Sequence, residues 1–407
     1  MTQTCYDLII VGAGASGLTA ALEASKGGLS VLVIEKNPKA GRKLLATGNG
    51  RCNLSNHSIS FQNYNLASYS HINLLLNKFQ TKECIDFFNS LGVLTTKNES
   101  GKIFPLSLHA KSIAWALYHN CLKEGASFLF DSKVISLKKD SNIFLVSTKE
   151  KQFKTKNLLI ATGGVASPKL GGSELGLEFA KNFGHKIEKI YPSLVQLKSS
   201  DKTLKLASGV KLEAVVTLMV DKKRVRSVQD DLLFRKDGLS GLSILALSKE
   251  ANFALEQNLS VVVSLDLLPT LSKEALLKHF KSNFNIKIPL DIFLSTILNP
   301  NLIPAILSRF KLQKNDLKND KKIREFVHFL KNWEVKIDGN YGFESAEVMA
   351  GGVSLDEIDE KTYESKIVKN LYFSGEVLNV DGDCGGYNLH FAWGSGIIAS
   401  KAILANA

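Results

Sequence analysis

The chain has 407 residues, which predicts two or three domains, and no apolar run approaches the roughly 18 residues of a membrane span, so we expect a cytoplasmic protein. Its five cysteines form no CxxC pair or Cys/His cluster, which argues against disulfides and a metal site. The net charge of +12 comes largely from scattered lysines, so we expect a solvated basic surface and no nucleic acid partner.

The first elements form a βαβ unit around a glycine-rich turn. An apolar strand at 6–11 runs into Gly12-Ala13-Gly14-Ala15-Ser16-Gly17, a helix follows at 18–25, and a second strand at 31–34 ends on Glu35. Gly12 permits the tight turn, Gly14 lets a pyrophosphate approach the backbone, and Gly17 lets helix and strand pack closely. The phosphates would bind at the helix N-terminus, and Glu35 would accept hydrogen bonds from both ribose hydroxyls. The pattern predicts a dinucleotide site.

An irregular Gly/Asn-rich stretch follows at 41–56, and one helix is then expected over 72–91 and another over 109–124. Short strands are expected at 127–130, 133–137, 143–147 and 152–154. A separate buried strand at 157–161 ends in Thr162-Gly163-Gly164. These elements complete the first part of a nucleotide-binding domain, residues 1–190.

At Tyr191 the sequence changes in character. Segments 210–220, 224–228 and 259–265 indicate antiparallel β structure, and the pattern from 272 to 332 is helical. Nucleotide-domain character returns near Ala346, with a short strand at 371–374 and a helix at 388–404. We therefore predict an α/β fold with a discontinuous Rossmann-type domain (1–190 and 346–407). The insertion, 191–345, is expected to be β-rich at 191–271 and 333–345 and helical at 272–332.

Two further glycine motifs favour FAD over NAD. One is the strand ending in Ala161-Thr162-Gly163, and the other runs from Leu371 through Gly375-Glu376 to Asn388. FAD needs contacts at both its adenosine and its flavin end, and distant segments can supply the second. The second motif resembles the late FAD motif of flavoproteins, which implies that Glu376 meets the ribityl chain. The Gly385-Gly386 turn would point N–H groups at the flavin pyrimidine, and the following helix would favour negative charge there.

These motifs and the stretch after Glu35 contain the residues expected to contact FAD. Arg42 and Lys43 offer charge to phosphates, and Asn49 and Arg51 are placed to wrap the pyrophosphate or cover the flavin; structural ion pairs remain the alternative for these residues. The full set is Gly12, Gly14, Ala15, Ser16, Gly17, Glu35, Lys36, Gly41, Arg42, Lys43, Asn49, Gly50, Arg51, Val134, Ala161, Thr162, Gly163, Gly375, Glu376, Asp381, Gly386, Asn388 and Leu389.

The sequence does not identify a catalytic residue. Cys384, Tyr387 and His390 are the candidates, because they surround the start of the last predicted helix. Each also has a structural alternative: a small loop residue, a stacking ring, and a capping or packing histidine. No second strand–GxGxxG–helix unit follows, so NAD(P)H would bind only transiently, over the flavin.

Further ordered motifs carry a resemblance to a known family. They include Gly48-Asn49-Gly50-Arg51-Cys52-Asn53, Ile103-Phe104-Pro105, Pro192-Ser193-Leu194, Leu233-Phe234 with Gly238-Leu239-Ser240-Gly241, Gly351-Gly352-Val353 and Glu364-Ser365-Lys366. Together they resemble the BaiN-like (bile-acid-reductase-like) bacterial NAD(P)/FAD-dependent oxidoreductases along essentially the whole chain. The resemblance implies a β-barrel-like insertion with a small helical part. Where the family usually carries Thr-His after Leu-Phe, this chain has Arg235-Lys236, which could favour an anionic substrate.

The resemblance also implies a flavin-dependent redox reaction on an unidentified small organic molecule. We expect hydride to move between NAD(P)H, flavin and that substrate, with an activated alkene as one candidate. The alternatives are a flavin amine oxidase that uses oxygen, and an FAD-bearing protein that binds or modifies RNA, which the charge would suit. The sequence gives neither the substrate nor the oligomeric state.

Overall fold

The computed structural model describes residues 5–283 and 288–407 and divides the chain into two compact units. Unit 1 comprises Met1–Ile190 and Val348–Ala407, and unit 2 comprises Tyr191–Glu347. The second boundary lies at 347/348, two residues after the expected 345/346. Residues 1–4 of the expected nucleotide domain and 284–287 of the expected helical part lie outside the described residues.

Unit 1 is built on a parallel sheet. Its strands are β1 (Cys5–Val11), β2 (Val31–Ile34), β6 (Ser127–Leu129), β9 (Gln152–Ile160) and β19 (Leu371–Phe373). The order is β6-β2-β1-β9, and β19 also pairs with β9. Every residue of β2 and β19 is buried, as continuous apolar runs in a parallel sheet predict.

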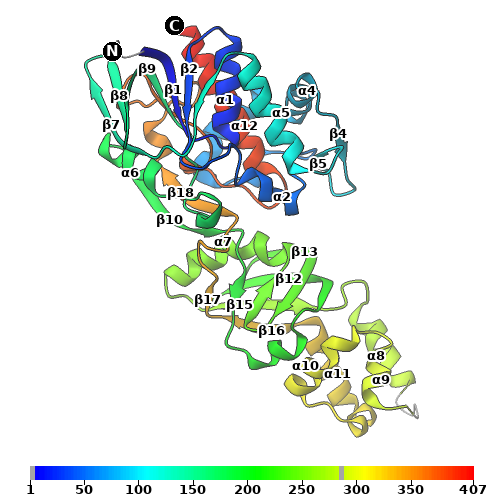
Figure 1. The fold of residues 1–407 in the computed structure, drawn as a ribbon. Coiled ribbons are helices and arrows are strands. Elements are labelled where there is room, and N and C mark those ends of the chain that lie inside the picture. The colour runs from blue at the N-terminus through cyan, green and yellow to red at the C-terminus, as the bar shows by residue number, and fades with distance from the viewer. Residues whose placement is uncertain (1–4, 284–287) are drawn as a thin grey trace. The chain divides into compact units, whose positions relative to one another are not determined.

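Helices of unit 1 cover this sheet. α1 (Ala15–Lys26) lies beside α12 (Tyr387–Ala405), the blue and red helices of Figure 1, and α1 also packs on α5 (Ala110–Lys123). Small residues allow the close approach of α12 to α1: a Cβ on Gly396 would lie 2.4 Å from the Ser16 carbonyl oxygen, and the Ser400 hydroxyl donates to the Ala20 carbonyl at 2.8 Å. The last segment of the chain is thereby fixed against the first helix.

β9 is one strand where we predicted two, so that prediction was wrong. Lys154 and Thr155 pair with β1, which makes the expected break between 154 and 157 part of the ladder. The first half of β9 pairs with β8 (Ile143–Thr148), which in turn pairs with β7 (Val134–Asp140), both antiparallel. The second half pairs with β19, so β9 joins the antiparallel strands to the parallel sheet.

The single helix predicted over 72–91 is also wrong. The chain forms α3 (Tyr69–Lys78) and α4 (Thr81–Ser90), separated by Phe79, whose φ of −147° and ψ of 83° are not helical. Gln80 and Glu83 form a capping box that starts α4. The apolar periodicity continues through the break, which is why the sequence pattern did not reveal it. The helix predicted over 109–124 corresponds to α5.

Shorter elements complete unit 1. The Gly/Asn-rich stretch contains the short helix α2 (Thr47–Gly50) and β3 (Ser55–Asn56), which pairs with β5 (Lys102–Pro105), and β5 pairs with β4 (Thr95–Lys97). α6 (Leu175–Asn182) follows β9, and β10 (Ile187–Ser193) pairs with β18 (Val348–Val353).

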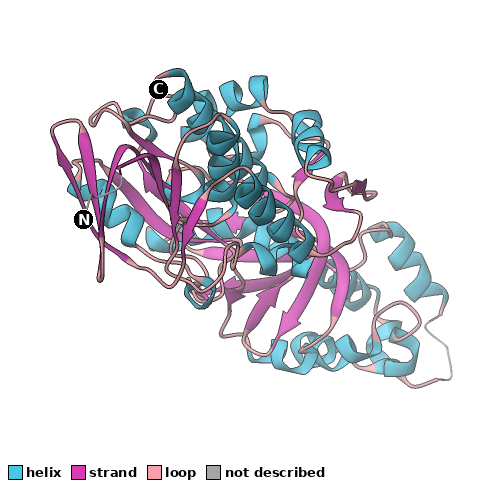
Figure 2. Cartoon of the chain, turned by 45° about the horizontal axis from the view of Figure 1, so that its top comes forward, coloured by secondary structure: helices cyan, strands magenta, loops and turns pink. Residues whose placement is uncertain are grey.

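Unit 2 contains an antiparallel sheet that closes on itself. The strands, in their order across the sheet, are β16 (Trp333–Ile337), β15 (Val261–Asp266), β12 (Lys211–Val220), β13 (Lys223–Arg235), β14 (Gly238–Ser240), β11 (Leu197–Lys198) and β17 (Gly339–Asn340). β16 and β17 stand at opposite ends of this order, yet only Asp338 separates them in the chain. The sheet must therefore curl into a barrel-like form, as its curvature in Figure 2 illustrates.

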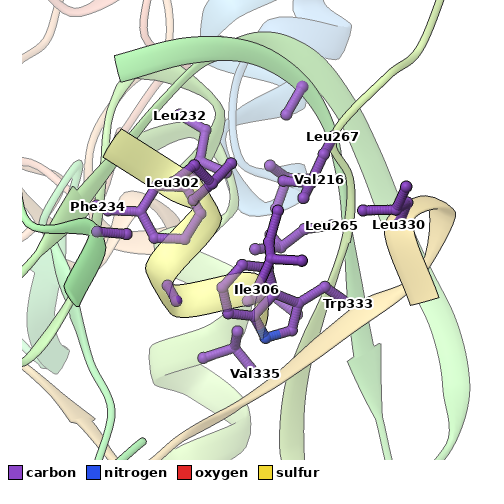
Figure 3. Close-up of a cluster of buried hydrophobic side chains, with 14 of the residues drawn as sticks. Val216, Leu232, Phe234, Leu265, Leu267, Leu302, Ile306, Leu330, Trp333 and Val335 are labelled. Carbon is purple, nitrogen blue, oxygen red and sulfur yellow. The ribbon is translucent and has the colours of Figure 1, made fainter. Parts of the chain in front are cut away.

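The helical part of unit 2 packs on the barrel. It comprises α8 (Lys273–Ser282), α9 (Leu290–Leu294), α10 (Ile303–Phe310) and α11 (Asp320–Lys331). In Figure 3, Ile306 of α10 and the neighbouring Leu302 lie among Leu265, Trp333 and other barrel side chains, all within one buried apolar cluster. The segment expected to be β-rich, 191–271, also contains a helix that we did not predict, α7 (Leu242–Glu256). Its Ile244, Leu247, Ala251 and Ala254 belong to the same cluster.

Candidate functional site

Three glycine motifs that are far apart in the sequence meet at the N-terminus of α1. A Cβ on Gly17 would lie 2.0 Å from the Gly12 carbonyl oxygen, and one on Gly12 would lie 2.5 Å from the Ala161 carbonyl oxygen. A Cβ on Gly375 would lie 2.6 Å from the Ser16 hydroxyl oxygen. The ends of β1, β9 and β19 therefore converge on one helix terminus, and only glycine allows this approach.

Gly14 differs from these glycines. No atom of the described residues lies within 4 Å of a Cβ built on it, and its φ of −81° is open to any residue. The chain's own packing therefore does not require glycine there, whereas a ligand lying against the backbone would. The first N–H groups of α1 have no acceptor within the helix, and its first turn carries no acidic side chain. This cradle fits the pyrophosphate of FAD.

Glu35 is held by hydrogen bonds at the end of β2. Its Oε2 accepts from the Ala13 N–H at 2.8 Å, and its Oε1 accepts from the backbone and side-chain nitrogens of Asn37 at 2.8 and 2.6 Å. The residue is only 8% exposed. A carboxylate has about four acceptor positions, so one remains for a ribose hydroxyl.

Several expected cofactor residues surround Glu35. Arg42 is exposed, and its guanidinium donates to Asn37 Oδ1 at 3.0 Å. Burial lowers the pKa of Lys36, and the nearby charges of Lys133 and Arg42 lower that pKa further while Glu35 raises it. Gly41 donates from its backbone to the Ala13 carbonyl at 2.8 Å.

Val134 follows a short segment that hydrogen-bonds to the chain at Glu35 and Asn37. The Ser132 N–H donates to the Glu35 carbonyl at 3.0 Å, and the Asp131 N–H donates to the Asn37 carbonyl at 3.2 Å. Val134 itself is buried at the start of β7. The structure therefore brings this segment next to Glu35, where the sequence predicts the adenosine ribose.

Lys43 and Glu376, two residues expected to contact the cofactor, pair with each other. Lys43 Nζ lies 2.7 Å from Glu376 Oε2, and Glu376 Oε1 accepts from the Met349 N–H at 2.8 Å. A Cβ on Gly163 would lie 3.7 Å from Glu376 Oε2, so the Thr162-Gly163 turn borders this pair. The ion pair holds the segment after β19 against the stretch after Glu35.

A second group of expected residues lies at the start of α12. The segment 53–56 packs against Gly385 and Gly386 there. A Cβ on Gly386 would lie 2.7 Å from the Ser55 carbonyl oxygen and 2.8 Å from Asn53 Oδ1, and Gly386 has a φ of 97°. Asn56 donates from Nδ2 to the Gly385 carbonyl at 3.1 Å. Asn388 closes the preceding loop, accepting from the Gly382 N–H at 2.8 Å and donating to its carbonyl at 2.9 Å.

The remaining residues of this end differ in exposure. Asp381 is buried, and its carbonyl accepts from the Asn65 N–H at 3.0 Å. Asn49, which adopts a φ of 55°, and Arg51 are both exposed, while Gly50 and Leu389 are half-buried. The Arg51 guanidinium carbon lies 5.2 Å from the centre of the Phe104 ring.

Sequence reasoning missed Asn53. Its Oδ1 is buried, and among the described residues it has no hydrogen-bond partner. The Gly48–Asn53 run supplied Asn49, Gly50 and Arg51 to the expected set but not this last residue. The available signal was the spacing of two asparagines on either side of a glycine and an arginine. An unpaired acceptor beside the first turn of α12 fits a ligand that carries an N–H group, as the flavin ring does.

His390 is a structural histidine by its geometry. It is fully buried, with Nδ1 2.9 Å from the Ser55 hydroxyl and Nε2 2.9 Å from the Phe79 carbonyl oxygen. A carbonyl only accepts, so Nε2 carries the proton and Nδ1 accepts from Ser55. Burial lowers the pKa of His390 to about 4. The ring is neutral and joins α12 to Ser55 and to the break between α3 and α4, which argues against an acid role.

Tyr387 and Cys384 lie closer to solvent than His390. The Tyr387 side chain packs over Gly385, where a Cβ would lie 2.6 Å from Tyr387 Cε2. Burial raises the pKa of Tyr387, and the nearby Asp383 and Cys384 raise it further. Cys384 is partly exposed. By contrast Cys52 is fully buried, and burial raises the pKa of its thiol to about 12.

Arg235 and Lys236, where the sequence departs from the family pattern, lie at the end of β13 in unit 2. The Arg235 guanidinium carbon lies 4.6 Å from the centre of the Tyr341 ring, and Lys198 Nζ lies 5.2 Å from it. Tyr341 also hydrogen-bonds Asp237. Arg235 therefore has an aromatic contact within its own unit.

Two kinds of feature are not found within the described ranges. Across residues 5–283 and 288–407, no group of three or more His, Cys, Asp or Glu side chains is placed to hold a metal ion. None of the helices in this part of the chain is long and apolar enough to cross a membrane.

Comparison with known proteins identifies the family. The model of the HI0933-like protein Rossmann domain matches residues 6–402. The chain belongs to this family. It is 31% identical over 401 residues to the 3-dehydro-bile acid delta(4,6)-reductase of Clostridium scindens, which covers 97% of this chain and 98% of that protein. It is 32% identical over 403 residues to a ribosomal RNA dihydrouridine synthase of Haemophilus influenzae, with the same coverages.

A solved structure shares the fold. The 3-ketosteroid delta1-dehydrogenase of Sterolibacterium denitrificans matches with a TM-score of 0.53 at 12% identity, over 99% of this chain and 100% of that one. The resemblance to BaiN-like proteins and the predicted fold class are confirmed by these relatives. This HI0933-like protein is an FAD-dependent oxidoreductase.

Proposed function

We propose that this protein is a reductase that saturates an electron-poor carbon–carbon double bond of a small organic substrate, with NAD(P)H as the electron donor. The proposal rests on one observation, that two relatives are named for the same type of reaction. The two relatives matched over 97% of the chain bear names that describe adding two hydrogens across a double bond, in a bile acid and in a uridine base. In both compounds a conjugated carbonyl withdraws electrons from that bond.

Different residues of unit 1 would bind different parts of one dinucleotide. The N-terminus of α1 binds the pyrophosphate, and Glu35 binds the adenosine ribose. The first turn of α12 favours negative charge on the pyrimidine edge of the flavin. FAD, when bound, supplies hydride transfer between the nicotinamide and the substrate. No second GxGxxG unit occurs in the sequence, so NAD(P)H would have to bind transiently and dissociate after each hydride transfer.

Saturation of a double bond also requires a proton. NAD(P)H provides a hydride for one carbon, and an acid must protonate the other. We assign this role to Tyr387, because its side chain packs over Gly385 at the start of α12, beside the expected flavin end. A phenol, whose ordinary pKa is about 10, carries its proton at neutral pH. His390 is excluded from the role by its two ring hydrogen bonds and its neutral state.

The test is anaerobic mixing of the purified flavoprotein with NADH, NADPH or a panel of amines. We expect NADH or NADPH to bleach the flavin absorbance, and a conjugated enone such as a steroid 4,6-dien-3-one to restore it. Bleaching by an amine but not by a nicotinamide, with recovery only in oxygen, would instead establish the amine oxidase. A protein that takes up no FAD would overturn both.

Uridine within ribosomal RNA is the second candidate substrate. Two relatives, from Haemophilus influenzae and Escherichia coli at 32% and 30% identity, are named ribosomal RNA dihydrouridine synthases, and this chain carries a net charge of +12. The tip of the β12–β13 hairpin exposes Lys222, Lys223 and Arg224. RNA that restores the bleached flavin and gains two hydrogens per uridine would select this candidate over a free small molecule. Its binding would weaken steeply with salt.

A further inference from the structure

We propose that Asn53 accepts a hydrogen bond from N3–H of the flavin ring and so recognises the pyrimidine edge of the cofactor. The inference rests on FAD as the cofactor of the proposed function. Asn53 lies between Cys52 and Leu54, both fully buried, and its backbone nitrogen would lie 3.2 Å from a Cβ on Gly48. The chain therefore holds this residue tightly from both sides.

The side-chain carbonyl of Asn53 finds no hydrogen-bond donor in the part of the chain that the structure describes. Its Oδ1 is buried and has no hydrogen-bond partner among residues 5–283 and 288–407. The Ser55 carbonyl oxygen, which would lie 2.7 Å from a Cβ on Gly386, is also an acceptor. Leaving a buried acceptor unpaired costs free energy, so such an atom in a ligand site points to a donor on the ligand.

Asn65 Oδ1 is also buried without a partner among the described residues, but Asn65 donates from Nδ2 to the Asn379 carbonyl at 3.1 Å, and two further asparagines hydrogen-bond to the loop before α12. Asn56 donates to the Gly385 carbonyl at 3.1 Å and accepts from the Ser58 N–H at 3.0 Å. Asn388 both accepts from and donates to Gly382. These two side chains shape the loop before α12. Asn53 sits against the same loop but does not hydrogen-bond to it, which separates its role from theirs.

The flavin offers a matching edge. The oxidised isoalloxazine ring has a single N–H group, at N3, flanked by two carbonyl oxygens. The first turn of α12 leaves the N–H groups of Tyr387, Asn388 and Leu389 without acceptors in the helix. Donors for a ring carbonyl and one acceptor for N3–H thus lie on either side of Gly386. A ring laid across this turn would find both kinds of partner.

The experiment compares FAD with 3-methyl-FAD, which lacks the N3–H. Both would be titrated into the full-length protein after removal of its flavin, with binding followed by fluorescence. We expect the unaltered protein to bind 3-methyl-FAD at least about tenfold more weakly than FAD, a difference of about 1.4 kcal/mol. In Asn53→Ala the two affinities should become equal. Asn53→Asp keeps an acceptor, so it should retain the preference, while its charge should lower the midpoint potential of the bound flavin.

Asn56→Ala is the matched control. It removes a hydrogen bond to the same loop, so it should lower stability but leave the FAD to 3-methyl-FAD ratio as in the unaltered protein. A ratio near one in the unaltered protein, or an unchanged ratio in Asn53→Ala, would overturn the proposal. So would an equal loss of the ratio in Asn56→Ala. Failure of the unaltered protein to take up FAD would refute the proposed function itself, which is a distinct result.

Discussion

The adenosine end and the flavin end of the site are built in different ways. At the adenosine end, Glu35 receives three hydrogen bonds from the chain, and Gly12 and Gly17 are required by close contacts with backbone atoms. At the flavin end, Asn53 Oδ1 lacks a partner among the described residues, and Asn49 and Arg51 are exposed. The first end is organised largely by contacts within the protein, whereas the second leaves a buried acceptor without a partner from the described chain. Substitutions should therefore affect folding at one end and chemistry at the other.

The largest effect should come from Gly17→Ala at the adenosine end. Its Cβ would lie 2.0 Å from the Gly12 carbonyl oxygen, which requires the backbone to move. We expect a loss of about 3 kcal/mol in the free energy of unfolding and no retained FAD. Denaturant unfolding and the flavin absorbance of the purified protein measure these changes.

Gly14→Ala is the matched control for Gly17→Ala. The described residues leave the space around Gly14 open, and its φ suits alanine, so stability should be unchanged. FAD affinity should nevertheless fall about tenfold or more, because the methyl group would occupy the space of the pyrophosphate. Equal destabilisation by both substitutions would contradict the distinction between protein-required and ligand-required glycines.

Tyr387→Phe tests the flavin end. If the phenol supplies the proton, kcat should fall about 100-fold, while FAD binding and stability remain close to those of the unaltered protein. Reduction of the flavin by NAD(P)H, measured in rapid mixing, should be unaffected, since the proton is needed only in the second half of the reaction. A slowed first half would contradict the assignment.

Glu35→Gln returns to the adenosine end with a smaller expected effect. The side-chain amide would place an N–H group against the Ala13 or Asn37 donors that now bind a carboxylate oxygen. We expect a loss of about 1–3 kcal/mol in stability together with weaker FAD binding. Glu23→Gln, on α1 and paired only at 3.8 Å with Lys26, is the control and should change neither quantity. Weaker FAD binding without any loss of stability would show that the chain does not depend on these hydrogen bonds.

The smallest effect is a pH dependence at the flavin end. The pKa of His390 is about 4 in the folded protein against an ordinary 6.5, so the unfolded chain binds a proton first as the pH falls. Stability should therefore decline by about 1.4 kcal/mol per pH unit between pH about 6.5 and about 4 on account of this group, and not change with pH above or below that range. Denaturant unfolding at several pH values measures the slope.

His390→Gln isolates this contribution, because burial also lowers the pKa of His71 and of His185. The glutamine amide can still donate to the Phe79 carbonyl, so the variant should fold. It should show a shallower decline with falling pH. An identical slope in both proteins would mean that His390 titrates normally and would reopen its candidacy as an acid.

The sequence alone determined the cofactor-binding framework. The Gly12–Gly17 turn between two apolar strands has one conformation that suits its glycines, and the acid at the end of the second strand follows directly from the chain. The α/β class and the return of the nucleotide domain after an insertion were equally visible, because strand and helix periodicities are local properties. Short-range signals also located α5 and α12 to within about a residue or two.

Only the tertiary structure decided the rest, since it depends on contacts between distant segments. Phe79 breaks a continuous apolar pattern because α3 and α4 cap separately, and His390 becomes a buried neutral link through Ser55 and Phe79. The closure of the barrel depends on pairing β16 and β17 with opposite edges of one sheet. The spacing of Asn49 and Asn53 marks this run in the sequence, but only the structure shows the Asn53 side-chain carbonyl buried against Gly386 and unpaired among the described residues.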